Sequence, residues 1–225
     1  MRFTPDRRGL GRRALLYARS APGTYVWLGM LFITTVAVHT MSPELEREFL
    51  RERSTNIQGL SEHPLRVLLA SALLVDGGYW LPYLLLYSVF HAPAERWLGT
   101  LRWLTVCVLA HVLATLISEG AVLVALWEGR APSSTVNTLD IGVSYALAGI
   151  VGVLVYRVPR RWRYGYLALV LLFYGAALAV GRTFTDLGHL VALLIGLACH
   201  PLTRGRDPGR ARPRNPKETP AARNG

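Results

Sequence analysis

The fold is decided by the stretch Asp140-Ile-Gly-Val-Ser-Tyr-Ala-Leu-Ala-Gly-Ile-Val-Gly152, which opens an apolar segment of a length suited to a membrane. Ser144 lies about one helical turn inside this segment. Its glycines are Gly142, Gly149 and Gly152. Because small residues let membrane helices approach closely, we expect another helix to pack here.

A second polar side chain, His189, lies at a similar depth in the apolar segment Leu187–Thr203. A serine and a histidine at matched depth in two helices can form a nucleophile and its general base. The alternatives are structural, because a serine in a membrane helix often bonds to its own backbone. We expect His111, in another apolar segment, to make a polar packing contact, and His91 to be solvated in a turn.

The composition indicates a membrane protein. Of the 225 residues 52% are hydrophobic, and the charges cluster outside long apolar runs. A pI near 10.3 could suggest nucleic acid, but the basic residues flank apolar segments, which is typical of positive-inside anchoring. We therefore expect no nucleic-acid partner. The single lysine among 25 basic residues indicates a GC-rich bacterial genome.

The two cysteines, Cys107 and Cys199, both fall inside apolar segments. Two lone thiols of this kind indicate neither a disulfide framework nor a metal cluster. We expect both to be packing residues, and we expect no metal or other cofactor.

The apolar runs predict an all-α membrane protein with six transmembrane helices. The expected spans are 21–41, 79–90, 101–123, 141–156, 164–180 and 187–203. This gives a basic arm over 1–20, a membrane domain over 21–203 and a disordered basic tail over 204–225. The arm and first span also resemble a signal peptide, but the run is long and lacks a small-residue cleavage site.

The segment between the first two spans is expected to lie at the membrane interface. Residues 42–62 are charged, with apolar residues at helical spacing, which predicts a short amphipathic helix. Residues 64–75 are apolar but too few to span, so we expect them to be partly inserted.

The charge distribution predicts the orientation. With the N-terminus inside, 19 Lys and Arg residues fall on the cytoplasmic side and 6 on the outer side. This asymmetry favours cytoplasmic N- and C-termini.

Spans two, four and six then all enter from the outer face. Their first turns hold Tyr79 and Tyr83, Ser144, and Asp186 with His189. Because polar groups in membranes tend to face a bundle interior or wet cavity, we expect a small polar pocket below the outer surface.

Several motifs occur at a characteristic spacing. They are Leu65-Arg66 before span two, Glu95-Arg96-Trp97-Leu98-Gly99 after it, Gly142-Val-Ser144 followed by Gly149 and Gly152, and His189 followed by Gly196. In this pattern the chain resembles the rhomboid family of intramembrane serine proteases, from about Pro64 to Leu202. The resemblance implies a structural role for the other motif residues, which are Arg66, Glu95, Gly99, Gly149, Gly152 and Gly196.

The chain departs from the family pattern at five positions. Tyr79 and Tyr83 stand where active rhomboids usually have a histidine and an asparagine that contribute to the oxyanion hole. Tyr145 replaces the glycine after the serine, Ala148 replaces an aromatic residue that can pack on the histidine, and Ala192 replaces a glycine.

The resemblance implies that Ser144 attacks a peptide carbonyl while His189 takes its proton. The oxyanion pocket would be formed around Tyr79, Tyr83, Gly142 and Tyr145, with possible support from Asp140 and Asp186. The tyrosine hydroxyls can donate hydrogen bonds, but the Tyr145 ring could fill space that a substrate or packing helix needs.

Two further interpretations remain open. The chain could be a catalytically inactive rhomboid-like adaptor that binds transmembrane segments. It could also be a small transporter, although it has no internal repeat and no charged residue at mid-bilayer. The expected partners are the lipid bilayer and a transmembrane substrate or client. The expected location is a bacterial plasma membrane.

Overall fold

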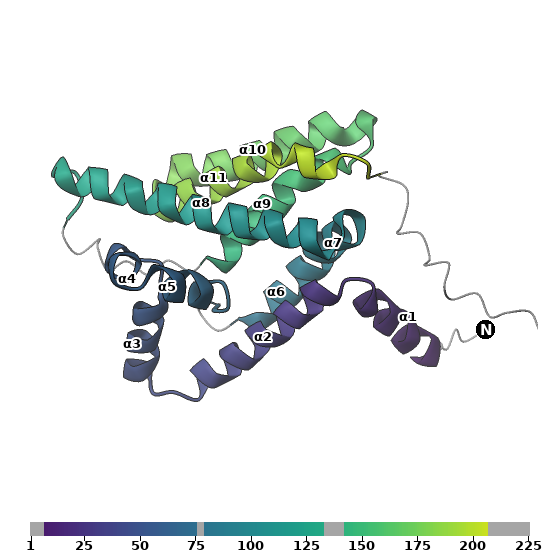
Figure 1. Ribbon diagram of the computed structural model, residues 1–225, viewed down its shortest axis with the longest axis horizontal. Coiled ribbons are helices and arrows are strands. Elements are labelled where there is room, and N and C mark those ends of the chain that lie inside the picture. Colours follow the sequence, from purple (N-terminus) through teal and green to yellow (C-terminus); the bar gives the residue numbers. More distant parts are fainter. Residues whose placement is uncertain (1–6, 76–78, 133–141, 207–225) are drawn as a thin grey trace, which may run out of the picture.

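The computed structural model describes residues 7–75, 79–132 and 142–206, and these form helices joined by short connections (Figure 1). The first helices are α1 (Arg7–Arg19), α2 (Pro22–His39), α3 (Pro43–Arg53), α4 (Ile57–Glu62) and α5 (Pro64–Ser71). The next are α6 (Trp80–Leu86), η2 (Tyr87–His91), α7 (Ala92–Leu98) and α8 (Thr100–Trp127). The last are α9 (Val143–Val153), η4 (Leu154–Tyr156), α10 (Arg160–Gly181), α11 (Phe184–Ala198) and η5 (His200–Thr203). The described part of the chain contains no strand, so the all-α prediction is confirmed there. The proposed tail lies almost wholly outside the described residues.

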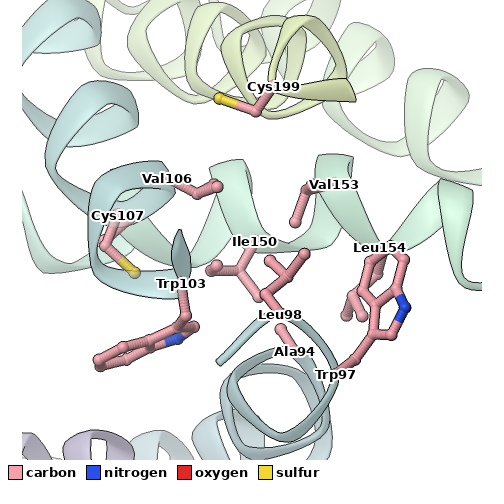
Figure 2. Packing of buried hydrophobic residues seen from close by; sticks show 11 residues of the cluster. Ala94, Trp97, Leu98, Trp103, Val106, Cys107, Ile150, Val153, Leu154 and Cys199 are labelled. Atoms are coloured by element: carbon pink, nitrogen blue, oxygen red, sulfur yellow. The ribbon is translucent and has the colours of Figure 1, made fainter. Parts of the chain in front are cut away.

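Helices α8, α9 and α11 form the centre of the molecule, where they pack against one another more extensively than the other described helices do. Helix α9 runs parallel to α11. Ser144, near the start of α9, contacts His189 of α11, and Gly152, near the end of α9, contacts Leu193, which comes later in α11. The apolar core below this contact includes both cysteines, which are free and buried, as expected of packing residues. Figure 2 shows their side chains with those of α7, α8 and α9.

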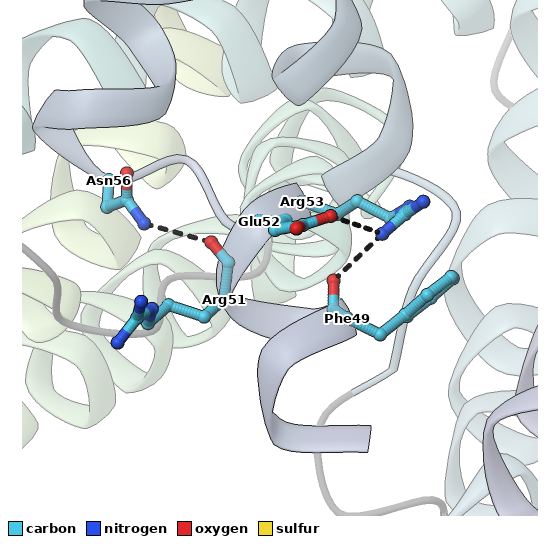
Figure 3. A network of polar contacts seen from close by, with 5 residues as sticks. All are labelled: Phe49, Arg51, Glu52, Arg53 and Asn56. Atoms are coloured by element: carbon cyan, nitrogen blue, oxygen red, sulfur yellow. Dashed lines mark hydrogen bonds and ion pairs between the residues drawn. The ribbon is translucent and has the colours of Figure 1, made fainter. Parts of the chain in front are cut away.

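The segment between α2 and α6 folds into the three short helices α3, α4 and α5 beside the bundle (Figure 1). Ser42 caps the start of α3 and Asn56 caps the start of α4, because each side chain accepts a hydrogen bond from a backbone N–H. Asn56 also donates to the Arg51 carbonyl, and Arg53 pairs with Glu52 (Figure 3). The eight residues of α5 are too few to span a membrane, as predicted.

The second predicted span continues much further than Phe90. After a π-helical turn at Tyr87–His91 the chain stays helical to Leu98 and ends at Gly99, whose φ of +86° suits glycine. His91 therefore lies inside the bundle, fully buried, so the prediction that it is solvated is wrong. Its ring stacks on Tyr87 at 3.9 Å, and its Nδ1 accepts a hydrogen bond from the Trp103 indole.

Helices α8 and α10 are each long and apolar enough to cross a membrane. Helices α1 and α2, bent by 103° relative to each other, count as a third crossing only if they are taken as one broken span, whereas α9 with η4 and α11 are shorter apolar helices. Almost all of α10 is on the surface, with Val180 85% and Leu172 70% exposed. Such a helix exposes far more apolar surface than a water-soluble surface normally tolerates, so these helices indicate a membrane protein.

Candidate active site

Glycines bring α9 and α11 into backbone contact. A Cβ on Gly152 would overlap the Leu193 carbonyl, and a Cβ on Gly196 would overlap the Gly149 carbonyl. A Cβ on Gly149 would also overlap Ala110 of α8. Because α9 and α11 are parallel, this contact fixes which residues face each other one to two turns nearer their starts.

Ser144 and His189 face each other at this level. The Ser144 Oγ lies 2.8 Å from the His189 Nε2, which is hydrogen-bond distance. Both side chains are partly exposed. Ser144 is the second residue of α9, where the helix dipole is positive, and the N–H groups of Tyr145 and Ala146 donate to the Gly142 carbonyl. The arrangement therefore combines a hydroxyl, an imidazole and the positive end of a helix dipole.

Tyr145 packs beside this pair without taking the place of either side chain. Its ring is fully buried and lies edge-on to the His189 ring, with 5.1 Å between centroids and 74° between planes. Its hydroxyl end occupies the space where Gly188 lacks a Cβ. The Tyr174 ring of α10 lies 6.2 Å from His189. The sequence suggested that Tyr145 could block a packing helix, but the absence of a side chain at Gly188 accommodates it.

His111 of α8 lies against the start of α9. A Cβ on Gly142 would overlap the His111 ring, so only glycine fits at this position. The His111 Nε2 lies 2.9 Å from the Leu68 carbonyl and 3.4 Å from the Ser71 hydroxyl, both in α5. His111 is thus a polar packing contact, as expected, and it ties α5 to the first turn of the helix that carries Ser144.

Tyr87 of η2 reaches the start of α9. Its hydroxyl donates to the Val143 carbonyl at 3.5 Å, and its ring is fully buried. Tyr83 lies one turn and Tyr79 two turns nearer the start of the helix, and Tyr79 is 74% exposed. The first turn of α9 therefore lies beside Tyr87 and not, as the sequence had predicted, beside the first turn of α6. Sequence reasoning missed Tyr87 because it assumed that this helix and α9 begin at one level, whereas α9 begins beside a residue about two turns into this helix.

Asp186 closes the first turn of its own helix. Its carboxylate accepts hydrogen bonds from the Thr183 backbone N–H and hydroxyl, while its own N–H donates to the Thr183 hydroxyl. This reciprocal capping box fixes the start of α11, one turn before His189. Asp140, the other acid expected to support the site, lies outside the described residues.

The remaining motif residues lie away from Ser144. Glu95 is 2% exposed, and its carboxylate accepts from the Gly23 and Thr24 backbone N–H groups at the start of α2. It also accepts from the hydroxyls of Thr24 and Thr100. Arg66 is exposed on α5, where it lines a hollow of about 530 Å³ together with Arg51. Glu95 and Gly99 therefore join helices, as motif residues of a structural kind would.

Comparison with known families decides the relationship. A family model described as "Rhomboid-like protein" matches residues 16–209, which is most of the chain. The chain belongs to the rhomboid-like family. Searches of curated proteins and of solved structures found no match for this rhomboid-like protein. The resemblance seen in the sequence motifs is thereby confirmed at the level of the family.

Proposed function

We propose that this rhomboid-like protein is an intramembrane serine protease in which Ser144 is the nucleophile and His189 the general base. The observation that carries the proposal is the 2.8 Å contact between the Ser144 Oγ and the His189 Nε2, made by two parallel apolar helices. A hydroxyl is a weak nucleophile until a base takes its proton, and this contact supplies that base. The substrate class is a peptide bond in or near a transmembrane segment.

The chemistry follows the usual acyl-transfer sequence. As the Ser144 Oγ bonds to the carbonyl carbon, its proton passes to the unprotonated His189 Nε2. The resulting oxyanion is stabilised by the positive end of the α9 helix dipole. His189 then protonates the leaving amine as the peptide C–N bond breaks. Water, activated by His189, hydrolyses the acyl-enzyme and restores the Ser144 hydroxyl.

The proposal places the protein in a plasma membrane with six spans and both termini in the cytoplasm. Support comes from the arginine-rich flanks and from the parallel course of α9 and α11. The helix formed by α6, η2 and α7 also runs with α9, because Tyr87 reaches the start of α9 and Leu98 shares a cluster with Ile150 and Leu154. Three helices thus enter the bundle in one direction.

One observation favours the alternative of an inactive adaptor. The tyrosines that stand at the usual oxyanion positions lie one and two turns before Tyr87, the residue that reaches α9. Losing one side-chain donor to an oxyanion costs about 2.7–4 kcal/mol of transition-state stabilisation. A rhomboid-like protein without such donors would keep the site architecture and bind transmembrane segments without cleaving them.

Labelling by a fluorophosphonate probe distinguishes the two functions. The purified protein is incubated with the probe beside Ser144→Ala and His189→Asn, and each variant is checked for a wild-type melting temperature. We expect covalent labelling of the wild type and none of Ser144→Ala, with His189→Asn slowed by at least about a hundredfold. Labelling that persists in Ser144→Ala, or a well-folded wild type that does not label at all, would refute the protease.

A further inference from the structure

A groove opens at the arginine-rich end of the molecule, beyond the end of α9 opposite to Ser144. It has a volume of about 550 Å³ and lies between the η2–α7 segment and the η4–α10 connection. Its lining includes Val89, Phe90, Pro93, Leu154, Arg157 and Tyr166. Most of these side chains are apolar, and the Arg157 guanidinium is the charged group among them.

The walls of the groove belong to apolar helices that the bilayer surrounds. Val89, on one wall, is 51% exposed, and the neighbouring helix α10 presents apolar side chains along most of its length. An apolar groove on such a surface is open to the acyl chains of the bilayer, whereas a water-soluble ligand would have to enter the bilayer to reach it. The shape and polarity therefore favour a lipid chain as the occupant.

The charge at the groove favours an anionic head group. Arg157 is half-buried, and burial together with the like charge of Arg96 lowers the pKa of its guanidinium. The Arg96 guanidinium is itself held over the Tyr17 ring at 4.9 Å from its centroid. The charge of Arg96, on α7, therefore acts on Arg157, which follows η4.

The described residues supply no carboxylate to neutralise these two cations. The ion pairs formed among the described residues lie elsewhere, within α3 and just after α8. Glu95 is next to Arg96 in sequence, but its carboxylate is occupied by the start of α2 and by Thr100. The Arg157 guanidinium, on the wall of an apolar groove, suits a phosphate with an attached acyl chain.

We propose that this groove binds one anionic phospholipid, with an acyl chain between η2–α7 and α10 and the phosphate on Arg157. The site is separate from Ser144 and does not depend on proteolysis. It differs from diffuse attraction of a basic surface to anionic lipids, because it requires both the groove and the half-buried Arg157. Arg161, nearby in the first turn of α10 but exposed, belongs only to the diffuse surface charge.

The test is a titration of fluorescent-chain phosphatidylglycerol into the detergent-purified protein, with unlabelled phosphatidylglycerol or phosphatidylcholine as competitor. We expect phosphatidylglycerol to compete better than phosphatidylcholine. We expect Arg157→Gln to weaken binding by about tenfold or more, because a hydrogen-bonded charge is lost. The matched variant Arg161→Gln removes the same charge and should change binding by less than about threefold.

A third variant tests the groove itself. Val89→Trp fills the hollow from a half-exposed position without changing any charge, and it should weaken binding of the labelled lipid as strongly as Arg157→Gln. Only variants that keep the wild-type elution volume in size-exclusion chromatography and the wild-type melting temperature are compared. Equal losses in Arg157→Gln and Arg161→Gln, or unchanged binding in Val89→Trp, would overturn the site in favour of diffuse attraction.

Discussion

Tyr145 supports His189 from the position directly after the proposed nucleophile. Ala148, where the family usually has an aromatic residue, is fully buried and has no ring to offer. The ring at 145 lies edge-on to the imidazole instead, and Gly188 makes room for it. The two departures that the sequence showed at 145 and 148 therefore compensate each other. An aromatic contact with His189 is kept, from a different position on the same helix.

This relation predicts that Tyr145→Ala and Tyr145→Phe behave differently. Removing the ring leaves a cavity and costs about 3–5 kcal/mol of stability, and it frees His189 to rotate away from Ser144. Tyr145→Phe keeps the ring and should cost about 1 kcal/mol, with labelling close to wild type. Melting temperature and the rate of fluorophosphonate labelling measure the two effects. A Tyr145→Ala protein that labels at the wild-type rate would show that the ring does not position His189.

At the level of the elements, glycines set the distance between α9 and α11. Gly196 and Gly175 offer a matched pair of substitutions, because a Cβ on Gly196 would overlap the Gly149 carbonyl whereas a Cβ on Gly175 of α10 would meet nothing within 4 Å. Gly196→Ala should lower the melting temperature and greatly slow labelling at Ser144. Gly175→Ala should stabilise the protein by about 0.5–1 kcal/mol, because it removes a flexible residue from a helix interior.

The contrast between these two variants is the test, and both are read by thermal unfolding and labelling in the same detergent. A Gly196→Ala protein as stable and as reactive as Gly175→Ala would mean that α9 and α11 are not in backbone contact.

How far the sequence predicts these elements depends on the range of the interaction. The apolar runs and the spacing of Ser144, His189 and the glycines are local patterns, and they predicted most helices and the pairing of two of them. The buried helix around His91 and Glu95 was missed, because its polar residues read locally as a turn. Burial of Glu95 depends on the start of α2, about seventy residues earlier in the chain, which donates two N–H groups to its carboxylate. Contacts of that range leave no local periodicity.

The relative depth of the helices also leaves no local signal. The sequence aligned Tyr79 and Tyr83 with Ser144 by assuming that the spans begin at one level. The helix does begin at Trp80, close to the expected start, but Tyr87, about two turns further on, reaches the start of α9. The offset between two helices depends on how they pack, and a count of residues along one helix does not contain it.

At the scale of the whole molecule, the proposed topology predicts which connections face the cytoplasm. The connection before α10 should be cytoplasmic and the one before α11 external, because basic residues gather at the former. Arg161 and Arg182 are both exposed and suit single-cysteine labelling. The native Cys107 and Cys199 are buried and are replaced by alanine as background. In intact cells a membrane-impermeant maleimide should label Arg182→Cys, and it should label Arg161→Cys only after lysis. Labelling of Arg161→Cys in intact cells, or of both positions alike, would contradict the six-span arrangement, because α10 would then no longer cross from the cytoplasmic to the outer side.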